Sequence, residues 1–221
     1  LFIITLMSTS RSTSELPNLR LAILMLAAGQ GSRMGSFPKA LLKKSDQTLL
    51  KRFCMAAQKL NPVELVLVTG FHAPVIEEHL QSFNGELDFS LKVIRNSQPE
   101  KGQASSVRLG LEAITKNYDV LLVALSDQPD IGGAEIIALL DEYQNKSAGQ
   151  EIILPIVDGQ RGNPVLFSKK AIEAILEIPG MVCRPYMDSH PQQVRRLVTN
   201  NKAYLVDVDT EDDIQRQDLV K

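Results

Sequence analysis

Cysteine, tryptophan and net charge are all scarce in this sequence. Its 221 residues include two cysteines and no tryptophan, and the formal net charge is -2. Cys54 and Cys183 match no metal-ligand spacing, so we expect both to be reduced, as in a cytoplasmic protein. The near-neutral charge argues against a basic surface that binds nucleic acid. The apolar stretch Leu1–Met7 is too short to span a bilayer and lacks the parts of a signal peptide, so we expect no membrane segment.

Apolar residues make up 44% of the chain and charged residues 23%, which is the balance of an ordinary globular protein with a sizeable core. The length suits one domain. Residues 8–18 are rich in serine and threonine, and we expect residues 1–19 to be an N-terminal extension that is disordered or vector-derived. We expect residues 20–221 to form a single domain.

After residue 19, short apolar runs alternate with helical patterns. The runs are typical of strands that are buried on both faces. The expected strands are Leu21–Ala27, Val63–Thr69, Leu91–Arg95, Tyr118–Leu125, Ile152–Pro155, Val165–Phe167 and Tyr204–Val208. The expected helices are Thr48–Leu60, Ala73–Gln81, Ala104–Ile114, Gly133–Asn145, Ser168–Glu177 and one capped by Thr210. This order predicts an α/β fold with a mostly parallel sheet, helices on both faces and ligands beyond the carboxyl ends of the strands.

The loop that follows the first expected strand, Leu26–Lys39, reads LAAGQGSRMGSFPK. Its glycines are Gly29, Gly31 and Gly35, and its basic residues are Arg33 and Lys39. The glycines let backbone N–H groups approach a phosphate, and the basic side chains add charge and donors for a triphosphate. The spacing fits neither a Walker loop nor a dinucleotide fingerprint, which needs glycine where Met34 stands. A plain glycine-rich turn with surface cations is the alternative interpretation.

The pattern L-A-A-G-x-G-x-R-M-G-x-x-P-K in this loop resembles the signature of the NTP-transferase superfamily. That superfamily includes sugar-nucleotide pyrophosphorylases, the methylerythritol cytidylyltransferase and the molybdenum cofactor nucleotidyltransferases. The resemblance implies a three-layer α/β/α nucleotidyltransferase fold that is Rossmann-like and similar to glycosyltransferase A. It also implies that Arg33 and Lys39 are catalytic. The nucleotide contacts that it implies in this loop are Leu26, Ala27, Ala28, Gly29, Gly31 and Gly35.

The motif Ser126-Asp127-Gln128-Pro129 directly follows the expected strand Tyr118–Leu125. A carboxylate at the end of a central strand, facing a phosphate loop, suits Mg²⁺, which proteins often hold through one or two carboxylates and the substrate phosphates. The alternative is an Asx turn in which Asp127 bonds only to nearby backbone. The segment Leu125–Pro129 (LSDQP) resembles the metal motif of molybdenum cofactor cytidylyltransferases.

The segment Lys101–Leu111 (KGQASSVRLGL) predicts a helix that opens at Gly102. Helix N-termini attract anions and offer unpaired N–H donors, although ordinary capping by Ser105 is the alternative. The segment resembles the family pattern G-x-x-S-S-[LV]-x-x-G-L. That likeness implies that Gln103, Ser105 and Ser106 lie against the base and ribose of the nucleotide.

A fourth segment, Gln160–Phe167 (QRGNPVLF), resembles the R-G-[HN]-P-V-L-F segment on the acceptor side of the same cytidylyltransferases. The likeness implies acceptor contacts by Gly162, Asn163 and Pro164. Many members carry histidine where this chain has Asn163, and an amide cannot take a proton at neutral pH. A glycine-proline turn that leads into a strand is the alternative.

The last segment, Val206–Asp213 (VDVDTEDD), resembles the family's [ND]-[IV]-[DN]-T-P-x-[DE] end. Alternation along the expected strand would place Asp207 and Asp209 on one face. We expect Asp209 to complete the Mg²⁺ site with Asp127. A solvated acidic turn is the alternative interpretation.

Together these resemblances imply an enzyme like the molybdenum cofactor cytidylyltransferases, which transfer CMP from CTP to the phosphate of a molybdopterin-type cofactor and release pyrophosphate. The expected partner is a molybdenum enzyme that receives the product. Guanylyltransferases of the same pathway have L-A-G-G, and the methyl group of Ala28 would crowd a purine more than a pyrimidine. The alternatives are such a GTP-using enzyme, another small cytidylyltransferase, and a catalytically silent nucleotide- or cofactor-binding protein.

Overall fold

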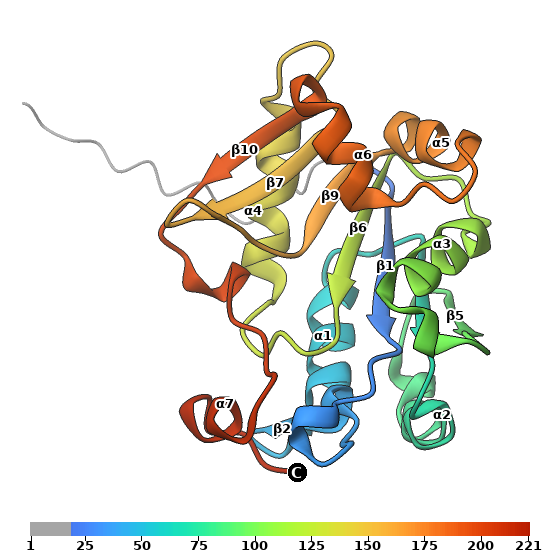
Figure 1. Ribbon diagram of the computed structural model, residues 1–221, viewed down its shortest axis with the longest axis vertical. Helices are drawn as coiled ribbons and strands as arrows, with labels where there is room; N and C mark the ends of the chain where they lie inside the picture. Colours follow the sequence, from blue (N-terminus) through green and yellow to red (C-terminus); the bar gives the residue numbers. More distant parts are fainter. Residues whose placement is uncertain (1–18) are drawn as a thin grey trace, which may run out of the picture.

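A mixed β-sheet with the strand order β10-β7-β9-β6-β1-β4-β5 forms the centre of the molecule, and β8 pairs with β7 (Figure 1). The structure is a computed structural model that describes residues 19–221. All but the last residue of the extension expected over residues 1–19 therefore lies outside the described residues. Within the described part of the chain, no helix has both the length and the apolar character needed to cross a bilayer.

The expected strands and helices are largely confirmed. The strands are β1 (Leu21–Ala27), β2 (Lys43–Lys44), β3 (Gln47–Thr48), β4 (Glu64–Thr69), β5 (Leu91–Arg95), β6 (Val120–Leu125), β7 (Ile152–Val157), β8 (Gln160–Arg161), β9 (Val165–Ser168) and β10 (Val194–Val198). The helices are α1 (Leu49–Gln58), α2 (Ala73–Gln81), α3 (Gln103–Ala113), α4 (Gly133–Gln144), α5 (Lys169–Glu177), α6 (Cys183–Ser189) and α7 (Glu211–Arg216). Strand β1 pairs in parallel with β4 and β6, whereas β9 runs antiparallel between β6 and β7.

Alternate residues of β1 face two separate apolar cores. Ile23 and Met25 contribute to a core that α1, α2 and α4 cover, and Leu24 and Leu26 contribute to one that α3, α5 and α6 cover. Helices α3 and α5 lie on the same side of the sheet in Figure 1. Because both faces are covered, every residue of β1 is buried, as its unbroken apolar sequence predicts. The three-layer α/β/α prediction is thus confirmed.

Helix α3 packs close to β1 because one of its residues has no side chain. A Cβ atom at Gly110 would lie 2.3 Å from Leu24 Cδ1 and 2.9 Å from Val68 Cγ2. Glycine therefore sets the distance between this helix and the sheet. That distance in turn sets the depth at which the N-terminus of α3 meets the carboxyl end of β1.

The prediction of a strand at Tyr204–Val208 is wrong. The chain forms a short 3-10 turn at Lys202–Tyr204 and then runs without strand partners up to α7, and the last strand of the sheet is β10. Alternating valine and aspartate mimic a strand, but the segment crosses the end of β6, where Val208 N–H donates to the Asp127 carbonyl at 3.0 Å. Strand β10 was not predicted, because the two arginines in this edge strand interrupt its apolar pattern.

Helix α6 was also not expected. Gly180 and Pro185 break the helical pattern around it, yet Pro185 stands in the first turn, where a missing N–H costs nothing. Asp158 and Gly159 form the turn of the β7–β8 hairpin, and both have positive φ.

Candidate active site

The glycine-rich loop between β1 and α1 folds as two short 3-10 turns, Ser32–Met34 and Lys39–Leu41. Gly31 has φ of 64°, and a Cβ atom there would lie 2.2 Å from the Phe37 carbonyl oxygen, so only glycine fits. Gly35 has φ of 69°, which also favours glycine. A Cβ atom at Gly29 would meet no atom within 4 Å, so the backbone there is open to a ligand.

A small apolar cluster joins this loop to the C-terminal end of the chain. It consists of Met34, Leu42, Leu49, Val208, Ile214 and Leu219. Lys43 and Val220 add a β-bridge between the same two segments. Residues that lie far apart in the sequence are therefore held against each other at the carboxyl ends of the central strands, near the C-terminus in Figure 1.

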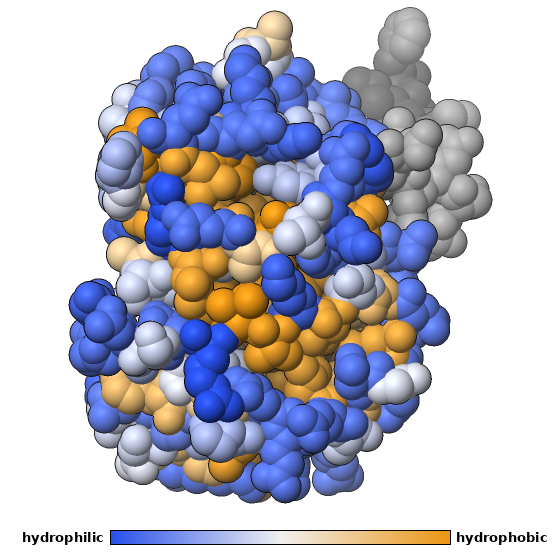
Figure 2. Space-filling view, turned by 90° about the vertical axis from the view of Figure 1, so that its right-hand side faces the viewer, coloured by the Kyte–Doolittle hydropathy of each residue, from blue (hydrophilic) through white to orange (hydrophobic). Residues whose placement is uncertain are grey.

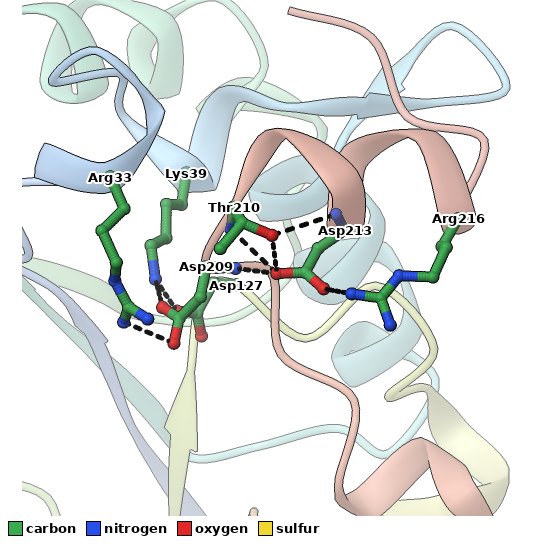
Figure 3. A network of polar contacts seen from close by, with 7 residues as sticks. All are labelled: Arg33, Lys39, Asp127, Asp209, Thr210, Asp213 and Arg216. Atoms are coloured by element: carbon green, nitrogen blue, oxygen red, sulfur yellow. Dashed lines mark hydrogen bonds and ion pairs between the residues drawn. The ribbon is translucent and has the colours of Figure 1, made fainter.

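Four charged side chains converge above this cluster (Figure 3). Lys39 Nζ lies 2.9 Å from Asp127 Oδ2 and also bonds to Asp209 Oδ1. Arg33 donates to Asp209 Oδ2 at 2.7 Å. Lys39 and Asp127 are largely buried, with side chains 17% and 18% exposed, whereas Asp209 is 31% and Arg33 66% exposed. Among the described residues, Asp127 accepts a bond from this lysine and none from the backbone, so the Asx turn is not formed.

The position of Asp209 depends on a helix cap rather than on a strand. Thr210 accepts from the Asp213 N–H, and the Asp213 carboxylate accepts from the N–H groups of Asp209 and Thr210. The predicted N-cap is thus confirmed as a reciprocal capping box. With Val208 tied to the carbonyl of Asp127, the cap directs Asp209 toward Asp127.

The charges of the site shift each other's pKa values. Burial opposes the charge on Lys39, but Asp127 and Asp209 outweigh it and raise the pKa of the ammonium group. Burial alone would raise the pKa of the Asp209 carboxyl group, but its interactions with Lys39 and Arg33 outweigh burial and lower this pKa. Asp207 forms no ion pair within the described residues, and the charge of Lys39 lowers its pKa only as the smallest of the contributions. Burial, and then the charges of Asp127 and Asp209, raise its pKa.

The donor set fits a hard divalent cation that is also bound by substrate phosphates. Asp127 Oδ1 is buried and has no hydrogen-bond partner among the described residues, and Asp209 supplies a second carboxylate nearby. No group of three or more histidine, cysteine, aspartate or glutamate side chains within residues 19–221 could hold a metal ion alone. Two carboxylates that leave positions for phosphates and water are typical of Mg²⁺.

A cavity of about 290 Å³ lies beside this network. Its walls include five residues of the predicted nucleotide site and Asp127; these are Leu26, Ala28, Gly29, Gln103, Ser106 and Asp127. The predicted Ala27, Gly31, Gly35 and Ser105 do not line it. Gln30, Phe71 and Pro99 also line it and were not predicted. A Cβ atom on Gly70 would lie 2.8 Å from the methyl group of Ala28, so only glycine fits beside Ala28 at this cavity wall.

The two predicted serines have different roles in the structure. Asn96 is buried and its amide donates to Ser105 Oγ and Ser106 Oγ, both at 2.9 Å. Ser105 Oγ donates to the Gly102 carbonyl, and the N-cap of α3 is Gly102 with φ of 87°. Ser105 is therefore not the N-cap that the alternative interpretation required. Ser106 is buried at the cavity wall.

A larger cavity of about 550 Å³ adjoins the first, and Leu26, Gln103 and Leu125 line both. It lies between the start of α3 and α6, on the apolar face of the sheet. The predicted acceptor residues Gly162 and Asn163 line it and Pro164 does not. Gly162 has no room for a side chain, because a Cβ atom would lie 2.8 Å from the Tyr204 carbonyl oxygen. Asp207 reaches this cavity rather than the Lys39 network.

Sequence reasoning missed Arg161, Cys183 and Arg184 at this second cavity. Arg161 stands within a recognised motif, so its spacing could have indicated it. The other two lie on the unexpected helix α6 and carry no sequence signal. Cys183 and Cys54 are both free and buried, and burial raises each thiol pKa to about 12.

The fold and this site define a nucleotidyltransferase, a class that takes its nucleotide from a nucleoside triphosphate. The chain belongs to the family of MobA-like NTP transferase domains, which it matches over residues 23–197. It is 28% identical over 187 residues to the bifunctional protein GlmU of Synechococcus sp. (strain RCC307), covering 83% of this chain but 38% of that relative. The chain thus spans less than half of that protein's length.

Three solved structures, of two proteins, share the fold. Rv0371c of Mycobacterium tuberculosis H37Rv is 25% identical with a TM-score of 0.68, covering 89% of this chain and 96% of that one. A manganese complex of that protein gives 23% identity and a TM-score of 0.66 over 90% and 97% of the chains. A nucleotidyl transferase from Methanothermobacter thermautotroptrophicus is 21% identical with a TM-score of 0.67, covering 90% and 96%.

Proposed function

We propose that this protein transfers CMP from CTP to the phosphate of a molybdopterin-type cofactor and releases pyrophosphate. One observation carries the proposal. A smaller cavity, bounded by the glycine-rich loop and α3, meets a larger one, bounded by the Gly162 segment and α6, beside the carboxylates Asp127 and Asp209. A transfer reaction needs two substrates to meet at one point. The match to MobA-like NTP transferase domains favours this class of reaction.

The residues of this chain would act mainly by position and charge. In an in-line displacement the acceptor phosphate attacks the α-phosphorus, and negative charge grows on the phosphoryl oxygens. Lys39 and Arg33 already carry their charge at this point, so they would stabilise it without reorganisation. Arg33 is two-thirds exposed and can turn toward a phosphate. No protein nucleophile is needed, and an ionised phosphate needs no general base.

We further propose Asp127 and Asp209 as the residues that hold Mg²⁺. When bound, the ion would neutralise phosphate charge and orient the triphosphate. The unpartnered oxygen of Asp127 supports this, and so does the existence of a manganese complex of the Mycobacterium tuberculosis protein with the same fold. The donors are oxygens, which hard divalent cations prefer.

The preference for CTP over GTP is supported by the wall of the smaller cavity. Ala28 lines this wall, and its methyl group has no rotatable bond by which it could move away from a larger base. Ser106 and Gln103 line the same cavity and offer polar groups to the base or ribose. A purine would have to displace packed atoms, which costs about 1–3 kcal/mol.

The test is a panel of the four ribonucleoside triphosphates with purified protein and Mg²⁺, with and without molybdenum cofactor, read as pyrophosphate release. Cofactor-dependent release with CTP above all others is the expected result. Pyrophosphate release with GTP instead of CTP would identify the protein as a guanylyltransferase. Release that needs a different phosphorylated acceptor would refute the cofactor assignment and keep the reaction class. No release with any pair would favour a silent binding protein.

A further inference from the structure

The larger cavity has a chemical character that the transfer reaction alone does not require. Its lining is mostly apolar, with strands as the floor and the helices α3 and α6 as walls. The apolar residues are Leu26, Ala104, Val107, Val123, Leu125, Leu154, Val165, Phe167, Val182, Pro185 and Met187. Figure 2 shows apolar side chains exposed in a hollow between two hydrophilic parts of this face. The volume of about 550 Å³ lies within the range of small-molecule sites.

Two arginines line this apolar cavity, and they differ in how their charge is satisfied. Arg161 Nη1 lies 2.5 Å from Asp188 Oδ1, so its charge is compensated and it ties β8 to α6. Arg184 is exposed and forms no ion pair within residues 19–221. Of the two arginines of this cavity, Arg184 is therefore the one whose guanidinium group has no carboxylate partner within the described residues.

We propose that Arg184 binds an anionic group of the acceptor, and that a flat ring system of the acceptor packs against the apolar walls of this cavity. The inference deepens the proposed function, because it describes the substrate of the same site. A guanidinium group binds carboxylate or phosphate through two parallel hydrogen bonds. A polyhydroxylated acceptor such as a sugar phosphate would leave hydroxyl groups unpaired against these walls, and each would cost free energy.

The charge at the edge of the cavity supports the need for such a cation. Asp207 lines the same cavity, and Asp127 lines the smaller cavity that adjoins it. A negatively charged acceptor that enters beside the Asp207 carboxylate is repelled by it. Arg184 offsets this repulsion on the wall formed by α6.

A binding measurement tests the site without requiring turnover. The probe is anilinonaphthalene sulfonate, an apolar aromatic ring system with one anionic group, and its fluorescence reports binding. We expect saturable binding to the native protein and about 10-fold weaker binding or more to Arg184→Ala, because a hydrogen bond to a charged group is lost. N-phenylnaphthylamine, which has similar rings and no sulfonate, should bind both proteins equally.

The matched control is Arg196→Ala, which removes an equal charge from an exposed residue outside this cavity. It should leave the affinity for both probes unchanged. Equal weakening by the two variants would overturn the proposal, because it would reveal a general charge effect. Absence of anionic-probe binding to the native protein, or unchanged binding to Arg184→Ala, would also overturn it.

Kinetics with molybdenum cofactor separate this inference from the proposed function. Arg184→Ala should raise KM for the acceptor about 10-fold and leave KM for CTP unchanged. If the native protein does not use this acceptor but the anionic probe still depends on Arg184, the proposed function fails and the anion site stands. If the acceptor is used with a KM that does not depend on Arg184, the proposed function stands and this inference fails.

Discussion

Removal of the Lys39 ammonium group should affect both stability and catalysis, because this group compensates two carboxylates at once. Lys39 Nζ lies 2.9 Å from Asp127 Oδ2 and also bonds to Asp209, and the lysine and Asp127 side chains are each less than a fifth exposed. Two unit charges about 4 Å apart attract by roughly 4 kcal/mol at the effective dielectric constant of a protein surface. Part of this is offset by the desolvation of the lysine. We therefore expect Lys39→Ala to lower the free energy of unfolding by about 1–3 kcal/mol.

The catalytic effect should be larger than the loss of stability suggests. Removal of one fixed donor from a site where negative charge develops costs roughly 100-fold or more in turnover, which is about 2.7 kcal/mol of transition-state stabilisation. Arg33→Ala should lower turnover by a factor of the same order, although the exposed Arg33 side chain contributes little to the free energy of unfolding.

The dependence on pH gives a sharper signature. The lowered pKa of Asp209 means that its pairing with Lys39 stabilises the protein above the ordinary carboxyl pKa and stops doing so as the pH falls through the folded value. The raised pKa of Lys39 means that its pairing stabilises the protein below the ordinary lysine pKa of 10.5 and is lost as the pH rises through the folded value. The difference in unfolding free energy between native protein and Lys39→Ala should therefore be constant near neutral pH and shrink at both extremes.

Urea denaturation across the pH range and steady-state pyrophosphate release are the measurements. The control is Lys44→Ala, which removes a lysine that pairs at 2.6 Å with Asp130 and not with the carboxylates of the site. It should cost at most about 1 kcal/mol and leave turnover near normal. The reasoning is refuted if Lys39→Ala and Arg33→Ala both turn over at near-native rates. A stability loss in Lys39→Ala that does not vary with pH would refute the electrostatic part.

Three further predictions follow from the same structure. Asp127→Ala should abolish Mg²⁺-dependent activity without unfolding the protein, and unchanged Mg²⁺–CTP binding in calorimetry would count decisively against its role as a metal ligand. Ala28→Gly should narrow a preference for CTP over GTP of about 5- to 150-fold, mainly by admitting GTP, and steady-state kinetics with both nucleotides would show whether it does. Arg20 lowers the pKa of Asp119 to about 2 through hydrogen bonds from its side chain and backbone. Asp119→Asn should therefore be less stable than the native protein at neutral pH, and this difference in stability should vanish as the pH falls from 3.8 toward 2. Thermal unfolding curves of the two proteins that do not converge over this pH range would contradict the prediction.

Much of the fold was predictable because burial on both faces leaves an unmistakable pattern. Strands β1 and β6 are continuous apolar runs, β4 is apolar between Glu64 and Thr69, and each helix that packs on them shows a helical pattern between turns. Asp127 could be placed because it directly follows one of these strands. The glycine-rich loop could be recognised because Gly31 and Gly35 require positive φ, which restricts the residue type.

The rest depended on contacts that no local pattern reveals. Asp209 reaches Asp127 because Val208 bonds to a backbone carbonyl at the end of β6, and not because a strand ends there. Edge strand β10 carries two arginines and pairs with the sheet along one side only. Arg184 faces a cavity only because α6 packs across the sheet. Such placements are set by tertiary packing between segments that are far apart in the sequence.

The close packing of α3 on β1 has a thermodynamic consequence. Gln103 opens this helix and lines both cavities, as do Leu26 and Leu125 on the strands beneath. A ligand that shifts or orders these residues in one cavity changes the affinity of the other, and linkage requires the coupling free energy to be the same in both directions. Since Gly110 leaves α3 in direct contact with Leu24, the helix cannot absorb such a shift by moving inward. Two ligands that occupied these cavities together would therefore act as reciprocal effectors across a shared wall.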